Sequence, residues 1–277
     1  MAQFTGTPFG DLIVGLDGER DVVQGGPGDD LLQGRPGDDA VFGGDGDDTP
    51  TGSSGDDLLR GGAGDDRLAG DQDDDTLLGE DGDDVLNGGQ GTDLLVGGPG
   101  GDRMFGGDGV DTASYADSPT RVVVDLSLGW GSGLDILDGI ENLVGSEIDA
   151  SDPGLLVTDD VLVGDSGDNR IEGLGGNDAL NGRQGSDVLD GGLGDDLLID
   201  TGGGDRFVGG PGPGRMVGAV GTGAPGADVF AFAGEGNLSD RDRSSRSDGM
   251  KETGSSSSTR STRRRSPSPR RTAERAS

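Results

Sequence analysis

Aspartates recur at every ninth residue through the first half of the chain, each inside a glycine-rich turn. Ten consecutive nonapeptides run from Gly25 to Ser114, and GGAGDDRLA at residues 61–69 is representative of them. Position six is aspartate in all ten, namely Asp30, Asp39, Asp48, Asp57, Asp66, Asp75, Asp84, Asp93, Asp102 and Asp111. Carboxylate and main-chain carbonyl oxygens are the ligands that hard divalent cations such as Ca²⁺ prefer. The spacing therefore predicts a ladder of cation sites with oxygen ligands only.

A second series of similar units begins at Gly164. Its position-six aspartates are Asp178, Asp187, Asp196 and Asp205. Asn169 and Gly214 occupy that position in the first and last units, so we expect weak or absent cation sites at both ends of this series. The segment GAPGADVFAF at residues 223–232 has the pattern of a closing unit, with Asp228 in the aspartate position. One cation between each adjacent pair of turns sets an upper limit of about eight sites in the first series and about four in the second.

The charge balance also requires a cation. The 277-residue chain has a formal net charge of −33 and contains 61 glycines. Residues 241–277 carry eleven Lys and Arg against four Asp and Glu, a net of +7, which leaves −40 on residues 1–240. Self-repulsion opposes compaction, and ordering glycine costs backbone entropy. Positive charge from outside the sequence must therefore accompany folding of the first 240 residues.

Two residue types that carry much of protein chemistry are missing. The sequence contains neither cysteine nor histidine. This excludes disulfides, zinc sites built on thiolate or imidazole, and catalysis that uses histidine as a base. The GDSG at residues 164–167 matches a serine-protease nucleophile motif, but its serine has no histidine to activate it. We therefore expect no enzymatic activity.

The elements that position these aspartates follow from the rest of each unit. Position eight is mostly apolar in the first series: Leu32, Val41, Pro50, Leu59, Leu68, Leu77, Leu86, Leu95, Met104 and Ala113. Each unit predicts a six-residue turn, in which glycines allow positive φ angles, followed by a three-residue strand whose middle side chain faces inward. Two units complete one coil, with a strand on each face and a turn at each edge. Stacked coils pair each strand with its counterpart one coil later, about 4.8 Å away. The predicted fold class is an all-β parallel solenoid.

The units resemble the RTX, or haemolysin-type, calcium-binding nonapeptide G-G-x-G-x-D-x-U-x, in which U is a large apolar residue. The resemblance extends over roughly residues 6–232, with an interruption in the middle. It implies a parallel β-roll, in which several Ca²⁺ ions lie between successive turns. It also implies that the position-six aspartates of both series and main-chain carbonyls are the ligands.

Four regions are expected along the chain. Residues 1–114 form the first array, with imperfect leading repeats at 6–24. Residues 115–163 are a spacer of solenoid coils without calcium turns, including a strand with alternating Val122, Val124, Leu126 and Leu128 and an inserted loop around 148–158. Residues 164–232 form the second array and closing unit. Residues 233–277 are an Arg- and Ser-rich tail whose composition predicts disorder. This tail is either an arm for polyanions or a segment without a selected role.

We expect a non-enzymatic protein that folds on binding calcium outside the cell, without an N-terminal signal peptide. Two alternatives stay open: a calcium-dependent module or fragment of a larger secreted enzyme or toxin, and a surface adhesin or matrix spacer. The expected partners are calcium ions. We expect no nucleic acid on the folded array and no membrane span. One outer face of the first array is apolar and could pack on the second array, another copy or a partner protein: Phe42, Leu58, Leu78, Leu94 and Val96.

Overall fold

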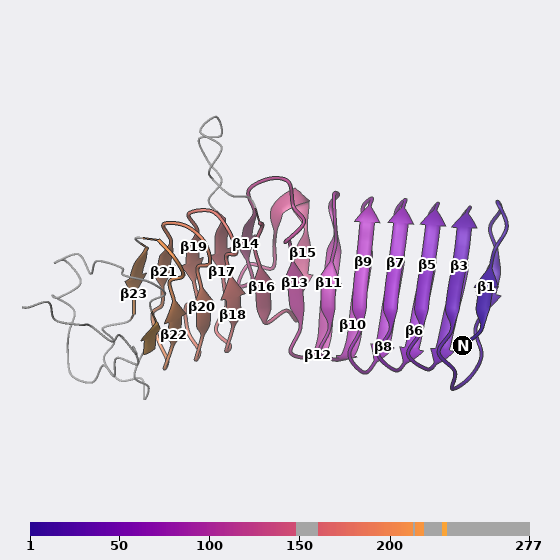
Figure 1. Cartoon of the computed structure of the whole chain (residues 1–277), viewed down its shortest axis with the longest axis horizontal. Coiled ribbons are helices and arrows are strands. Elements are labelled where there is room, and N and C mark those ends of the chain that lie inside the picture. The colour runs from indigo at the N-terminus through magenta and orange to yellow at the C-terminus, as the bar shows by residue number, and fades with distance from the viewer. Residues whose placement is uncertain (148–159, 213, 219–228, 232–277) are drawn as a thin grey trace, which may run out of the picture.

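The computed structural model describes residues 1–147, 160–212, 214–218 and 229–231, and the statements below concern these residues. They form 24 β-strands and one 3-10 turn, η1 (Ser132–Leu134), without any α-helix. The strands lie side by side along the long axis of the molecule (Figure 1). No described segment forms a helix with the length and apolar character needed to cross a membrane. The predicted all-β parallel solenoid is confirmed. The predicted loop around 148–158, Asp228 of the closing unit and the tail at 233–277 lie outside the described residues.

The strands form three sheets. A 12-stranded sheet runs the length of the solenoid, in the order β1 (Gln3–Thr5), β3 (Val22–Pro27), β5 (Ala40–Asp45), β7 (Leu58–Ala63), β9 (Thr76–Asp81), β11 (Leu94–Val96), β13 (Thr112–Ser114), β16 (Asn142–Val144), β18 (Arg170–Glu172), β20 (Val188–Asp190), β22 (Arg206–Val208) and β24 (Val229–Ala231). The opposite face holds two sheets. The seven-stranded sheet contains β15 (Ile136–Asp138), β12 (Arg103–Gly109), β10 (Val85–Gly91), β8 (Arg67–Gln72), β6 (Thr49–Ser54), β4 (Leu31–Pro36) and β2 (Leu12–Val14). The five-stranded sheet contains β14 (Val123–Asp125), β17 (Val161–Val163), β19 (Ala179–Asn181), β21 (Leu197–Ile199) and β23 (Arg215–Val217).

Strand pairing within the arrays confirms that two units make one coil. In the first array, Leu58 of β7 pairs with Thr76 of β9 in a parallel ladder. In the second array, Ala179 of β19 pairs with Leu197 of β21, again one coil later. Consecutive units therefore contribute strands to opposite faces. Equivalent turns are stacked along each edge, which is the arrangement needed to bring position-six aspartates together.

The core is a narrow file of position-eight side chains between the two faces. Leu59, Leu77 and Leu95 of the 12-stranded sheet are fully buried, as are Leu32 and Leu86 of the opposite face. The second array continues this core with its own buried position-eight residues, Ile171, Leu180, Leu189, Leu198 and Phe207. Burying a large apolar side chain contributes roughly 1.5–3 kcal/mol. One such residue per nonapeptide is a thin core, and the turns must supply the remaining stabilisation.

The strands of the first array are longer than the sequence pattern predicts. Most have six residues, since positions one to three of the next unit continue the parallel pairing beyond position nine. For example, Gly62 and Ala63 of β7 pair with Glu80 and Asp81 of β9. The prediction of a six-residue turn was therefore wrong for this array. Strands in the second array have the expected three residues.

The spacer contains solenoid strands and one additional strand. β15 pairs with β12, and β16 pairs with β13, so these two continue the first array. β14 pairs instead with β17 and begins the five-stranded sheet. Val122 and Val124 are buried as expected, but Leu128 is 68% exposed because the strand ends at Asp125.

Candidate calcium-binding ladder

The position-six aspartates form continuous hydrogen-bonded ladders along both edges of the solenoid. The backbone N–H of Asp66 donates to Oδ1 of Asp84 at 2.8 Å, and that of Asp84 donates to Oδ1 of Asp102 at 2.9 Å. The other edge repeats the pattern from Asp57 to Asp75. In the second array, Asp178 donates to Asp196, and Asp187 donates to Asp205. Each carboxylate thus uses one oxygen to connect its turn to the turn of the preceding coil.

The second carboxylate oxygen remains unpaired in the first array. Oδ2 is buried and has no hydrogen-bond partner among the described residues in Asp30, Asp39, Asp48, Asp57, Asp66, Asp75, Asp84, Asp93, Asp102 and Asp111. The same holds for Oδ2 of Asp187 in the second array. These aspartates are at most 3% exposed. A buried charged oxygen without a partner is strongly destabilising. When they are ionised, these oxygens therefore need a compensating positive charge.

Position-one glycines leave the space into which these oxygens point. A Cβ placed on Gly61 would overlap Oδ2 of Asp66 and would lie 2.7 Å from the carbonyl oxygen of Gly79. The same overlap occurs at Gly70 with Asp75 and at Gly79 with Asp84. A carboxylate and a carbonyl of adjacent coils thus face one small space, and oxygen donors of this mixture suit Ca²⁺. The residues present fit calcium.

Positive φ angles occur at other positions of the unit. Gly62 at position two has φ 122°, and Gly64 at position four has φ 136°. Position two also holds Arg35, Ser53, Asp71 and Glu80 with positive φ, and Asp73 adopts φ 71° at position four. Glycine at position one therefore provides space in these rungs, whereas positions two and four adopt a left-handed backbone that a few other residues also accommodate.

Electrostatics make the calcium-free ladder unfavourable at neutral pH. Burial raises the pKa of Asp66 to about 7 and that of Asp75 to about 8, although each accepts a backbone hydrogen bond, which lowers it. Neighbouring carboxylates raise both pKa values further. Burial also raises the pKa of Asp187 to about 8. Calcium would supply the opposing charge that favours the ionised form.

Four further acidic residues continue the ladders, but protein donors occupy their Oδ2 atoms. The hydroxyl of Tyr115 donates to Oδ2 of Asp135 at 2.8 Å, and the N–H of Ser146 donates to Oδ2 of Asp160 at 2.6 Å. Near the N-terminus, Leu16 donates to Oδ2 of Asp21 at 2.6 Å, and Thr7 donates to Oδ2 of Asp11 through both its N–H and its hydroxyl. These rungs are completed by protein groups where the others require a cation.

These four residues lie outside the position-six columns of the two series and were not predicted to join the ladders. They share a five-residue pattern, acid-x-apolar-x-Gly, found as DLIVG at 11–15, DVVQG at 21–25, DILDG at 135–139 and DVLVG at 160–164. Glu141 has the same pattern in ENLVG, and its Oε2 accepts from the N–H of Asp111 at 2.8 Å. This shorter pattern would have identified all five.

The ends of the second array differ from its middle. Asn169 is buried, and its amide accepts from the N–H of Asp165 and donates to the carbonyl of Glu141, both at 2.9 Å. Protein groups therefore engage both ends of this amide. Gly214 has no side chain that could bind a cation. Weak or absent cation sites at both ends of the second array therefore stay a prediction.

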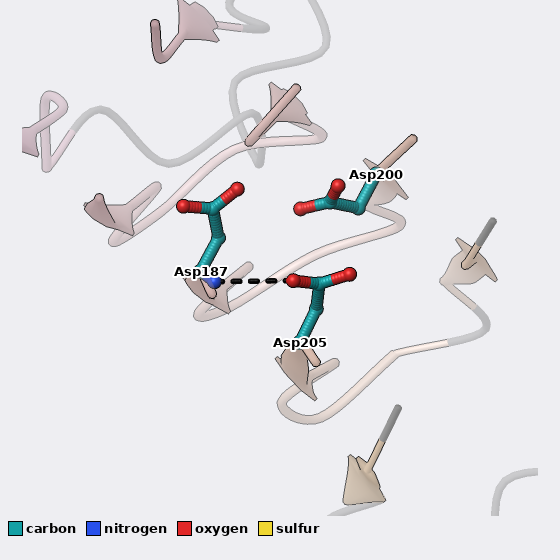
Figure 2. A group of neighbouring side chains, drawn as sticks. All are labelled: Asp187, Asp200 and Asp205. Carbon is teal, nitrogen blue, oxygen red and sulfur yellow. Dashed lines mark hydrogen bonds between the residues drawn. The ribbon is translucent and has the colours of Figure 1, made fainter. Parts of the chain in front are cut away.

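A group of three carboxylates was not foreseen. Asp187, Asp200 and Asp205 are all buried, and one oxygen from each lies within 4.8 Å of the others (Figure 2). Asp200 stands at position one of the unit DTGGGDRFV, where the other complete units of both arrays have glycine. An acidic residue at position one, where the other units have glycine, was the sequence feature that could have identified this group.

Comparison with known protein families agrees with the geometry. The family of the RTX calcium-binding nonapeptide repeat (4 copies) matches residues 16–50, 51–86, 78–113, 158–189 and 181–214, which together exceed half of the chain. No curated protein matches the chain. The matched segments include most of both arrays and all the unpaired Oδ2 atoms described above. The chain therefore belongs to the RTX calcium-binding nonapeptide-repeat family and is a calcium-binding β-roll.

Proposed function

We propose that this protein is a non-enzymatic β-roll that binds several calcium ions outside the cell and folds as it binds them. The observation that carries the proposal is the row of buried Oδ2 atoms without a donor in the first array. When it is ionised, such a row is compatible with a folded state only if cations lie beside it.

Two kinds of oxygen atom would contribute to calcium binding. Position-six aspartates would offer Oδ2, and position-one carbonyls of the next coil would offer a neutral oxygen. The Oδ1 atoms of the same aspartates accept hydrogen bonds from backbone N–H groups of the preceding coil and so hold the turns in register. Calcium supplies the positive charge that a segment of net charge −40 lacks. The free energy of ion binding then becomes free energy of folding.

The location outside the cell follows from the affinity that we expect. Modular extracellular calcium sites have dissociation constants of about 10⁻⁴–10⁻³ M. Sites in this range would stay empty at the low calcium of a cytosol and fill at millimolar calcium. A chain that stays expanded before export and folds after it fits this difference.

Calcium titration of the full chain tests the proposal. We expect circular dichroism to show coil without calcium and β-structure at millimolar calcium, together with a fall in hydrodynamic radius. Magnesium should fail at equal concentration, since it demands octahedral geometry and loses its water reluctantly. A β-spectrum that persists in excess EGTA would overturn the proposal. Detection of the protein in cells but not in the medium would overturn its extracellular part.

A further inference from the structure

We propose that Asp187, Asp200 and Asp205 form a distinct cation site, richer in carboxylates than the other rungs, which Ca²⁺ occupies first. This inference rests on the proposed function, because it assigns one site within the same calcium-binding roll. The three residues come from two units that are neighbours along one edge: Asp187 precedes β20, while Asp200 and Asp205 stand at positions one and six of the unit that leads from β21 into β22 (Figure 2).

The site is best understood by comparison with an ordinary rung. At Gly61, an added Cβ would meet one carboxylate oxygen, from Asp66, and the carbonyl oxygen of Gly79, which lies one coil later. At Gly182, an added Cβ would overlap Oδ2 of Asp187 and Oδ2 of Asp200. Gly182 and Asp200 have the same separation as Gly61 and Gly79. Residue 200 therefore presents a charged carboxylate to the space where the other rung presents a neutral carbonyl.

Burial makes this substitution chemically significant. Asp187 is 1% exposed, Asp200 is 2% exposed and Asp205 is 1% exposed. Oδ2 of Asp187 accepts from no N–H or hydroxyl donor among the described residues and, with both carboxylates ionised, faces the Asp200 carboxylate without a proton between them. Asp205 is held in place because its Oδ1 accepts from the N–H of Asp187 at 3.1 Å. An unpaired, buried carboxylate oxygen pointing at a second carboxylate indicates a cation between them.

The additional carboxylate changes the affinity expected of the site. Calcium affinity in proteins rises with the number of charged ligands and with the rigidity of the site. This site has three carboxylates on a stacked backbone, and residue 200 adds a charge that position-one glycines lack. We expect it to bind Ca²⁺ about tenfold more tightly than the average rung, within the span over which ligand charge tunes such sites.

Competition of the full chain with a chromophoric calcium chelator measures the classes of site directly. In the unmodified protein, we expect one ion per chain in a tight class that precedes the rest of the titration. Asp200→Gly restores the residue found at position one of the other units, and Asp200→Asn keeps the shape while removing the charge. Both variants should lose the tight class by about tenfold in affinity, while the β-spectrum at saturating calcium stays unchanged.

Asp195→Ser is the control for acidity, because Asp195 is exposed, lies in the neighbouring turn on the opposite edge and is a serine at the equivalent position in the unit of Ser186. It should retain the tight class. Loss of that class in Asp195→Ser to the same extent would overturn the proposal in favour of general acidity. A tight class that persists in both Asp200 variants would also overturn it, because the tight site would then lie elsewhere. Absence of the tight class from the unmodified protein would overturn it as well and would favour a proton shared between Asp187 and Asp200. These outcomes leave the roll itself intact, whereas failure of the proposed function would appear as no calcium-induced folding at all.

Discussion

The hydroxyl of Tyr115 donates a 2.8 Å hydrogen bond to Oδ2 of Asp135, the carboxylate oxygen that the ten position-six aspartates of the first array leave without a donor. At this rung, at the end of the seven-stranded sheet, a protein group takes the place that we propose for a cation elsewhere. We therefore expect rungs with a protein donor to Oδ2 to be free of ions and rungs without one to bind calcium.

Tyr115→Phe should destabilise the calcium-bound roll, because it leaves a buried carboxylate oxygen without its donor. The expected loss is about 1–3 kcal/mol, measured by thermal unfolding at saturating calcium. In an Asp135→Asn background, where the charge is absent, the same substitution should cost less. Equal costs in the two backgrounds would contradict the assignment of this rung.

Asp66→Ala and Asp65→Ala remove the same formal charge from one turn but should have different effects. Asp66 is buried, with an unpaired Oδ2, whereas Asp65 is exposed and its Oδ1 accepts from the N–H of Asp83. We expect Asp66→Ala to raise the calcium midpoint and flatten the transition, and Asp65→Ala to change the midpoint less. Asp66→Asn keeps an acceptor for the N–H of Asp48 and so isolates the lost charge. Equal shifts for Asp65→Ala and Asp66→Ala would mean that bulk acidity binds calcium.

The effect of pH should have opposite signs without and with calcium. Burial raises the pKa of Asp48 to about 6, of Asp57 to about 7 and of Asp75 to about 8, from a usual 3.8. A raised pKa in the folded state means that stability is greatest below the unfolded value and is lost as pH rises through about 6–8. The calcium-free chain should therefore show more β-structure near pH 4 than near pH 8.

Protons and calcium compete for the same oxygens, so the calcium midpoint should move the other way. We expect a higher midpoint at about pH 5.5 than at about pH 8. Circular dichroism in calcium-depleted buffers, with defined calcium added back, measures both trends. A midpoint that is independent of pH in this window would contradict a role for the buried carboxylates.

Pro50→Leu should stabilise the first array. Pro50 is buried at position eight of its unit, within β6. Pairing of β6 with β8 begins only at Thr51, which agrees with an interrupted ladder at the proline. Leucine would match Leu32 and Leu68 on either side. We expect the thermal midpoint in calcium to rise by about 2–4 °C, and Pro36→Leu, at an exposed position three, to leave it unchanged. A lower midpoint for Pro50→Leu would indicate overpacking instead.

The apolar outer face of the first array stays a predicted contact surface. Phe42, Leu58, Leu78, Leu94 and Val96 lie on β5, β7, β9 and β11 of the 12-stranded sheet, and Leu94 is 37% exposed. The second array extends the same sheet, so its described strands do not cover this face. The predicted occupants of this face that remain are another copy of the chain and a partner protein. Hydrogen exchange at increasing protein concentration should show protection of these strands relative to the opposite face, and Leu94→Gln should abolish it. Equal exchange on both faces would contradict this prediction.

Much of this fold could be predicted from the sequence because one short unit determines it. Position eight defined the core, position six defined the edge ladders, and the two-unit coil followed from their alternation. Strand length could not be predicted, because pairing of Gly62 with Glu80 depends on how closely turns stack. The protein-capped rungs were missed for a related reason. Tyr115 and Asp135 are 20 residues apart, and only the folded chain brings the hydroxyl to the carboxylate.

The additional strand β14 limits how far cooperative folding can spread. Between β13 and β16 the 12-stranded sheet continues without a break, but the opposite face passes from the seven-stranded to the five-stranded sheet at β15 and β14. In a linear repeat array, each unit is stabilised by its neighbours, so a weakened junction separates blocks that melt independently. At this junction the continuous parallel ladder runs through only one face, while the other face is linked by the isolated bridges of Trp130 to Asp125 of β14 and Ile136 of β15. The protein should therefore unzip in two stages on calcium removal, with the spacer as the boundary between them.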